Sequence, residues 1–160
     1  MTTNPPLNIR TAVRADLPAI AAMLADDVLG ASRERPGDLS VYESAWRQMQ
    51  AQAGNEVLVA VVGSQVVGCL QLIVIPGLAR QGALRAQIEG VRVASTHRGQ
   101  DIGERMFVHA IERARAAGCH LVQLTTDKRR TDAHRFYERL GFEATHEGMK
   151  LELGAAAGAR

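Results

Sequence analysis

The chain has 160 residues, of which 46% are hydrophobic and 22% charged, and its formal net charge at pH 7 is +2. This composition is ordinary for a folded chain with a buried core, and it excludes a disordered chain and a strongly basic nucleic-acid surface. The longest apolar stretches, such as Val57–Val62 and Cys69–Ile75, have the length of strands and are too short to span a bilayer. We expect one domain over residues 1–153 and a flexible tail over residues 154–160.

The first half of the chain predicts a strand, two helices and a hairpin. Asp16 and Pro18 are typical of a helix start, and Ser40 precedes a second helical stretch. Gly63 and Ser64 separate two β-branched runs at the spacing of a tight hairpin. The expected elements are a strand at Leu7–Val13, a helix from Asp16 with an apolar stripe to Val28, a helix at Val41–Ala53, and strands at Glu56–Val62 and Gln65–Ile75.

The second half predicts a strand–helix–strand unit followed by a short helix. A helix between two strands of one sheet crosses over right-handedly and makes those strands parallel, and ligands bind where such crossovers begin. The expected elements are a strand at Ala83–Val93, a helix at Glu104–Ala117 ended by Gly118, a strand at Cys119–Thr125, a helix at Asp132–Leu140 capped by Thr131, and a strand or hairpin at Phe142–Leu153.

The six residues from Arg98 to Gly103 form a glycine-containing turn before the Glu104–Ala117 helix. Unpaired backbone N–H groups and the positive end of the helix dipole make such a turn suitable for phosphate. Its spacing matches neither the dinucleotide-binding Gly-x-Gly-x-x-Gly motif nor the P-loop of nucleotide triphosphatases. The turn therefore predicts a phosphate-bearing ligand held by backbone groups.

Two motifs together resemble the GNAT superfamily of N-acetyltransferases. The turn is similar to its Arg/Gln-x-x-Gly-x-Gly/Ala signature, although Asp101 stands where the middle glycine usually falls. The Phe-Tyr-Glu-x-Leu-Gly-Phe run at 136–142 is typical of the C-terminal region of that superfamily. The stretch at 128–137 also resembles the aminoalkylphosphonate N-acetyltransferases.

The resemblance implies the GNAT fold, with acetyl-CoA as co-substrate and no metal. This is a mixed α/β fold: a central, mostly antiparallel sheet of six to seven strands, splayed at the strand ending near Val93 and flanked by about four helices. Coenzyme A would lie along that strand and on the turn. The candidate cofactor-binding residues are Val91, Arg92, Val93, Arg98, Gly99, Gln100, Asp101, Ile102, Gly103, Arg130 and His134.

Three of these positions carry alternatives. Arg130 stands where many relatives have an asparagine that binds the pantetheine arm, so its contact must differ. His134 is three residues before Tyr137 on one helix face, where a structural role competes with proton transfer or substrate binding. Asp101 would repel a pyrophosphate unless its side chain turns outward to Arg105, four residues on.

The resemblance implies Tyr137 as the general acid at the departing sulfur, and a packing role is its alternative. Glu89 lies two residues before Val91, so strand alternation predicts the same face for both side chains. Many relatives carry a base, or a carboxylate that orders a water, on this strand. A structural pairing of Glu89 with Arg85, Arg92 or a backbone group is the alternative.

The favoured function is an N-acetyltransferase that moves acetyl from acetyl-CoA to a primary amine of a small metabolite by direct attack in a ternary complex. The alternatives are an acetyltransferase for a protein or aminoacyl-tRNA amine, and a non-catalytic acyl-CoA-binding module. Arginines in the loops at 30–39 and 76–85 favour an anionic group on the acceptor, or are solvated surface charges. A homodimer is a further expectation.

The cysteines and the first residues bear on the cellular compartment. Cys69 and Cys119 each lie in an apolar run without a cluster of partner residues, so we expect buried thiols rather than a disulfide. The first six residues lack a basic segment followed by an apolar one, so no secretory signal is expected. These features predict a cytoplasmic protein with no nucleic-acid or membrane partner.

Overall fold

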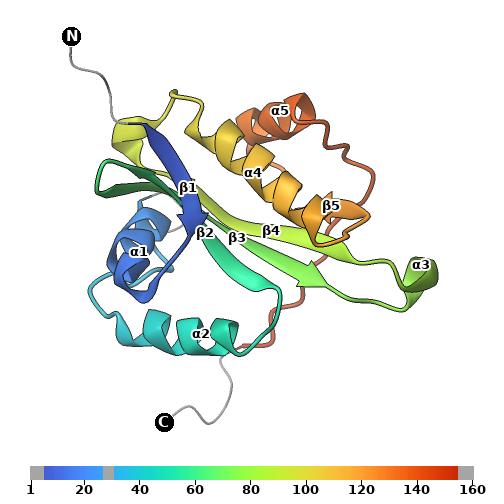
Figure 1. Ribbon diagram of the computed structural model, residues 1–160, viewed down its shortest axis with the longest axis horizontal. Helices are drawn as coiled ribbons and strands as arrows, with labels where there is room; N and C mark the ends of the chain where they lie inside the picture. Colours follow the sequence, from blue (N-terminus) through green and yellow to red (C-terminus); the bar gives the residue numbers. More distant parts are fainter. Residues whose placement is uncertain (1–5, 27–30, 155–160) are drawn as a thin grey trace. The chain divides into compact units, whose positions relative to one another are not determined.

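A five-stranded sheet in the order β1-β2-β3-β4-β5 forms the centre of the first of two units (Figure 1). The computed structural model describes residues 6–26 and 31–154. Its contacts divide the chain into two compact units, Met1–Leu124 and Thr125–Arg160.

The first unit contains all five strands and four of the helices. The strands are β1 (Leu7–Thr11), β2 (Asn55–Val62), β3 (Gln65–Ile75), β4 (Arg85–Val93) and β5 (Leu121–Gln123). The helices are α1 (Leu17–Ala25), α2 (Ser40–Gln50), α3 (Ala79–Gly82) and α4 (Ile102–Ala116), with 3-10 turns at Arg14–Asp16 and Ser95–His97. The second unit contains α5 (Thr131–Arg139).

The pairing confirms the expected mixed, mostly antiparallel sheet. β1, β2, β3 and β4 pair antiparallel in sequence order, and β4 and β5 pair parallel around the crossover helix α4. Within this unit, α1 and α2 lie on one side of the sheet and α4 on the other (Figure 1). The loop from the end of β4 to the start of α4 therefore begins at the carboxyl end of β4, where a ligand of such a sheet binds.

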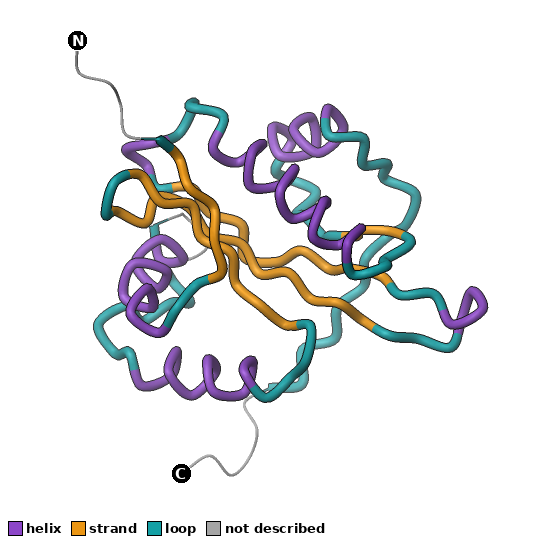
Figure 2. The backbone as a smooth tube through the Cα atoms, in the orientation of Figure 1, coloured by secondary structure: helices purple, strands orange, loops and turns teal. Residues whose placement is uncertain are grey.

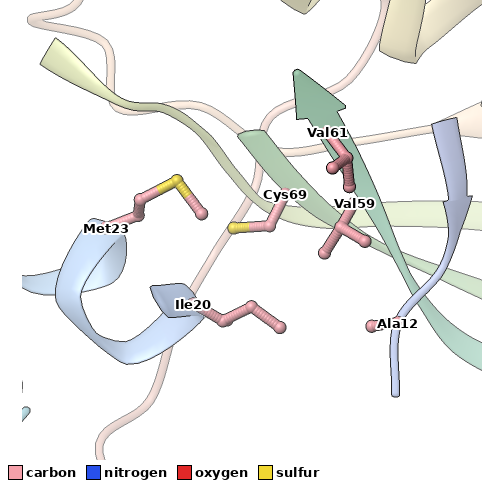
Figure 3. Packing of buried hydrophobic residues seen from close by; sticks show 6 residues of the cluster. All are labelled: Ala12, Ile20, Met23, Val59, Val61 and Cys69. Atoms are coloured by element: carbon pink, nitrogen blue, oxygen red, sulfur yellow. The ribbon is translucent and has the colours of Figure 1, made fainter. Parts of the chain in front are cut away.

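Apolar side chains from both faces of the sheet form the core. On the α1 face, Ile20 and Met23 pack with Val59 and Cys69 (Figure 3). On the other face, α4 packs closely against β3. A Cβ atom added to Gly68 on β3 would lie only 2.6 Å from the sulfur of Met106 on α4. This close packing fixes α4, and with it the turn that precedes α4.

A bulge interrupts β4 near its end. Glu89 pairs with Gln71 and Arg92 pairs with Cys69, so one extra residue of β4 is inserted between these two pairs. Gly90 has φ +60°, the left-handed conformation that favours glycine at a bulge. The bulge confirms the expectation that Gly90 permits one here.

β4 also splays from β5 as expected. The two strands pair only over Arg85–Gln87 and Leu121–Gln123. Within the described part of the first unit, no strand pairs with that side of β4 from Glu89 to Val93. The backbone groups there form an open sheet edge.

The strand count and the C-terminal strand differ from expectation. The described chain has five strands rather than six to seven, and residues 142–153 form none (Figure 2). Met149, Leu151 and Leu153 alternate as in a strand, yet their side chains are 84–96% exposed. A strand needs a hydrogen-bonded neighbour, and the described part of the second unit supplies none.

Helix starts are also built differently from the expected caps. The Asp16 carboxylate does not cap α1; it accepts the Val13 N–H at 2.8 Å and two hydrogen bonds from Arg10. At α2, Ser40 is the first helical residue, and Asp38 accepts from both its N–H and its hydroxyl. Arg130, rather than Thr131, precedes α5 as its N-cap residue.

The expectations at Val28, at Gly30 and for most of the tail lie outside the described residues. In the described part of the chain, no helix has both the length and the apolar character needed to cross a membrane.

Candidate functional site

The turn between β4 and α4 presents unpaired backbone N–H groups. Arg98 is extended, Gly99 has φ +75°, and Asp101 is the N-cap residue of α4. The Arg105 N–H donates to the Asp101 carbonyl, and no side chain caps the helix. The first N–H groups of this 15-residue helix therefore remain available to an anion.

Arg98 contributes its backbone to this turn while its side chain is held elsewhere. Its Nε donates to the Val93 carbonyl at 3.3 Å, and its Nη2 donates to the Asp26 carbonyl at 3.2 Å. The Asp26 carboxylate lies 3.9 Å from the same nitrogen. The guanidinium thus ties the turn to the end of α1.

Asp101 adopts the left-handed conformation, with φ +57° and ψ +11°. This conformation explains why the signature usually has glycine at this position. Glycine adopts the left-handed conformation without steric cost, and most other residues do not. The Asp101 side chain is exposed, but the described structure contains no ion pair between it and Arg105. The expected pairing with Arg105 is therefore wrong, and the position of the carboxylate away from the cofactor stays a prediction.

Val91, Arg92 and Val93 lie on the open edge of β4, directly before the turn. All three are partly buried, and the Arg92 side chain donates to the Val91 carbonyl at 2.8 Å. An extended polyamide can add to such an edge as a further strand. Only residues 94–97, which include the 3-10 turn at Ser95–His97, separate this edge from the turn at Arg98–Gly103, and both belong to one unit.

Glu89 lies at the base of the bulge, and its side chain is exposed. The expected shared face with Val91 is wrong, because the inserted residue places Arg92 on the face of Glu89 instead. The Gln87 amide donates to its carboxylate at 3.4 Å, and Glu89 forms no ion pair within the described residues. The alternative pairing with Arg85 therefore does not occur. Glu89 is an accessible carboxylate that keeps hydrogen-bonding capacity.

Four amide side chains and the Glu89 carboxylate lie together on one face of the sheet, in a group that we call the amide row. Residues that pair directly across strands point to the same face, so the register places this row on the face of Cys69 and α1. Sequence reasoning missed it, although the polar Gln71 inside the apolar run Cys69–Ile75 was a signal. The members are Asn55, Gln71, Gln87, Glu89 and Gln123.

Tyr137 lies on α5 in the second unit and is half-buried. Its ring makes edge contacts with Phe136 and Phe142, at centroid distances of 5.4 and 6.1 Å. These contacts orient the phenol ring within this unit.

His134 and Arg130 hold the loop before α5 in place. His134 Nε2 lies 3.2 Å from the Asp127 carbonyl, and the Arg130 N–H donates to the same carbonyl at 3.0 Å. Arg129 donates through its side chain and backbone to the Asp127 carboxyl, which holds the pKa of that carboxyl far below its usual range. A structural role for His134 is thus visible, and the Arg130 side chain is exposed.

Neither cysteine is placed as a nucleophile. Burial raises the pKa of the Cys69 thiol to about 12 and also raises the pKa of the half-buried Cys119. Both are free thiols, as expected. Among the described residues, no group of His, Cys, Asp and Glu could hold a metal ion.

The arginines of the two candidate substrate loops are exposed. Arg33 and Arg35 precede α2, and Arg80 lies in α3, at the tip of the β3–β4 hairpin (Figure 1). Arg85 begins β4. Their role in binding an anionic group of the acceptor stays a prediction.

Comparison with known proteins shows similarity to acetyltransferases. The model of the acetyltransferase (GNAT) family matches residues 21–142. The glucosamine 6-phosphate N-acetyltransferase of Trypanosoma brucei brucei is 30% identical over 129 residues, covering 79% of this chain and 86% of that protein. The aminoalkylphosphonate N-acetyltransferase of Salmonella typhimurium is 43% identical over 60 residues, covering 38% of this chain and 39% of that protein.

Among solved structures, a protein from Bacillus halodurans C-125 described as a transcriptional regulator is similar throughout. It is 50% identical, superimposes with a TM-score of 0.88, and the match covers 92% of this chain and 99% of that one. The likeness therefore extends over nearly the whole fold.

Proposed function

Because the chain belongs to the acetyltransferase (GNAT) family and is an acyltransferase, we propose that it moves acetyl from acetyl-CoA to the primary amine of a small metabolite. The amine attacks the thioester directly in a ternary complex. This proposal assigns the cofactor to the β4 edge and the turn before α4.

One observation carries the proposal: the open β4 edge is followed, after the 3-10 turn at Ser95–His97, by an uncapped helix N-terminus. Coenzyme A has an extended amide-containing arm and a pyrophosphate, and these two groups match the two features in that order. Val91, Arg92 and Val93 would pair with the arm. The backbone from Gly99 to Gly103 would receive the pyrophosphate.

The chemistry requires three proton and charge movements. The amine loses a proton, its nitrogen attacks the thioester carbonyl carbon, and the carbon–sulfur bond breaks as the thiolate takes up a proton. We assign proton removal to Glu89, directly or through a water. We assign protonation of the thiolate to Tyr137, from its place in the Phe-Tyr-Glu-x-Leu-Gly-Phe motif.

We propose a small phosphorylated or phosphonate-bearing amine as acceptor, because relatives act on glucosamine 6-phosphate and on aminoalkylphosphonates. The formal net charge of +2 gives no support to a tRNA acceptor. A non-catalytic role remains the second candidate, since a 50% identical structure is described as a transcriptional regulator. Turnover separates these two candidates.

The deciding experiment is a screen for thiol release from acetyl-CoA with amino acids, polyamines, glucosamine 6-phosphate and 2-aminoethylphosphonate. We expect release that depends on the amine, with the acetylated amine identified by mass spectrometry. Binding of acetyl-CoA without release for any amine would contradict the proposal and favour the non-catalytic candidate.

The assigned roles predict separate losses of turnover. Tyr137→Phe and Glu89→Gln should each lower kcat by about 10²-fold or more, since positioned acids and bases contribute that much. The acetyl-CoA Kd, measured by calorimetry, should stay near that of the unchanged protein. Glu138→Gln, at an exposed position on α5, is the matched control. An unchanged kcat in either variant would remove that residue from the mechanism.

We propose a cytoplasmic location, which the two free thiols support. The homodimer and the single domain over residues 1–153 stay predictions.

A further inference from the structure

The amide row offers hydrogen-bond acceptors at one place on the sheet. Gln71 on β3 and Glu89 on β4 pair directly, so their Cβ atoms lie about 4.5–5.5 Å apart on one face. Each side chain is tied on its far side to other amides. The direction of those hydrogen bonds determines which polar atoms of Gln71 and Glu89 are left to bind a ligand.

The first chain of hydrogen bonds leads away from Gln71. Its Nε2 donates to the Asn55 Oδ1 at 2.7 Å, and the Asn55 Nδ2 donates to the Gln52 Oε1 at 3.0 Å. In a planar side-chain amide, the oxygen and the nitrogen point in different directions from the same carbon. With Nε2 held at β2, the Gln71 oxygen is left to accept, and it receives no donor among the described residues.

The second chain leads toward Glu89. The Gln123 Nε2 donates to the Gln87 Oε1 at 2.8 Å, and the Gln87 Nε2 donates to the Glu89 carboxylate at 3.4 Å. This order fixes which end of the Gln87 amide faces Glu89. The Glu89 carboxylate thereby accepts one hydrogen bond from Gln87, and its remaining lone pairs can accept from a ligand.

We infer that Gln71 and Glu89 together bind the protonated amine of the acceptor, with Gln71 as a binding residue that the family resemblance did not indicate. This inference rests on the proposed function and deepens it. Two acceptor oxygens, one of them anionic, match an ammonium group that has three N–H donors. A hydroxyl or thiol acceptor has a single donor and no charge, so this pair selects for amines.

The pair also gives the proton a destination. The bound ammonium transfers one proton to the Glu89 carboxylate, and its nitrogen regains the lone pair that attacks the thioester carbonyl carbon. The Gln71 oxygen accepts another N–H and holds the nitrogen in place during the transfer. After the attack the nitrogen loses its second proton, the carbon–sulfur bond breaks, and the thiolate takes up one proton from Tyr137, which recovers it from the proton that the nitrogen released. Coenzyme A therefore leaves as the thiol, and the proton on Glu89 passes to solvent.

The test compares Gln71→Met with the control Gln65→Met. Methionine keeps the approximate size of glutamine and removes the acceptor oxygen, and Gln65 is an exposed residue at the start of the same strand. The probe is 2-aminoethylphosphonate, with ethylphosphonate as its deaminated competitor. If the screen favours glucosamine 6-phosphate, that amine and 2-deoxyglucose 6-phosphate replace them.

We expect Gln71→Met to raise the KM for the amine by about 10- to 100-fold, the loss of one hydrogen bond to a charged group. The KM for acetyl-CoA and the inhibition constant of the deaminated competitor should not change. Gln71→Glu should retain the amine KM, because a carboxylate oxygen replaces the amide oxygen and the Asn55 amide can rotate to donate to it.

Each contrary outcome has its own meaning. An unchanged amine KM in Gln71→Met, or an equal loss for the deaminated competitor, would overturn the amine site at Gln71. Thiol release from no amine at all by the unchanged protein would instead overturn the proposed function.

Discussion

At the scale of single residues, Asp101 shows why one motif position departs from its family. Its left-handed backbone is what the usual glycine provides, and Asp and Asn tolerate this conformation better than other side chains. We expect the exposed carboxylate to leave the turn able to bind, because the contacts proposed for the pyrophosphate are made by backbone N–H groups. Asp101 thus supplies the backbone conformation that a glycine would supply at this position.

Asp101→Gly should relieve this strain. We expect the free energy of unfolding, measured by urea denaturation, to rise by up to about 1 kcal/mol, since relief of the left-handed strain exceeds the extra chain entropy of glycine. The acetyl-CoA Kd should be unchanged or lower, because a negative charge near the pyrophosphate is removed. Asp101→Ala, which keeps the strain, is the control. Weaker cofactor binding in Asp101→Gly would assign the carboxylate a role of its own.

Residue roles were predicted from the sequence where a motif carried them. Arg98 was expected to bind the cofactor, yet its guanidinium contacts Asp26, which is 72 residues away in the chain. Gln71 was passed over as part of an apolar run, because its significance depends on pairing with Glu89 across the sheet. Such partners are set by register, and no single stretch of sequence contains them.

At the scale of elements, the β4 bulge joins the two parts of the proposed cofactor site. One inserted residue shifts the alternation of β4 between Glu89 and Arg92. The same bend coincides with the separation of β4 from β5. A substitution that strains the bulge should therefore affect cofactor binding as well as stability.

Gly90→Ala is predicted to cost about 1–2 kcal/mol in unfolding free energy, the penalty of a left-handed backbone at a non-glycine residue. Space is not limiting, because the nearest atom to the new Cβ would be Leu24 Cδ2 at 3.9 Å. The KM for acetyl-CoA should also rise. Gly118→Ala has the same backbone penalty, at φ +83° beyond the end of α4. It should lower stability without changing this KM, and equal KM values for the two variants would contradict the link.

Elements with strong local signals were predicted closely, and others were not. The hairpin strand at Gln65–Ile75 has the expected bounds, since alternation and a turn at Gly63-Ser64 define it locally. The expected strand at residues 142–153 has the alternating pattern without a partner. Pattern therefore predicts which face is apolar, and pairing decides whether a strand exists.

At the scale of the whole molecule, the proposed cofactor should act as a stabilising ligand. A ligand that binds only the folded state stabilises it by RT ln(1 + [L]/Kd). The proposed contacts lie in the first unit, at the end of β4 and the start of α4, where core residues such as Met106 and Phe107 are fully buried. Binding at this point therefore opposes unfolding of the sheet and of α4 together.

Acetyl-CoA at 100 times its Kd should add about 2.7 kcal/mol, which corresponds to a rise in Tm of about 5–10 °C for a chain of this size. Gly103→Asp should abolish the rise, because it places a carboxylate beside the proposed pyrophosphate position at the start of α4. Gln71→Met should retain it, since Gln71 is assigned to the amine alone. Differential scanning calorimetry of the three proteins, with and without acetyl-CoA, checks all of these expectations. A full Tm rise in Gly103→Asp would mean that the cofactor phosphates bind away from this turn, and the assignment of Arg98–Gly103 would then be wrong even if turnover were observed.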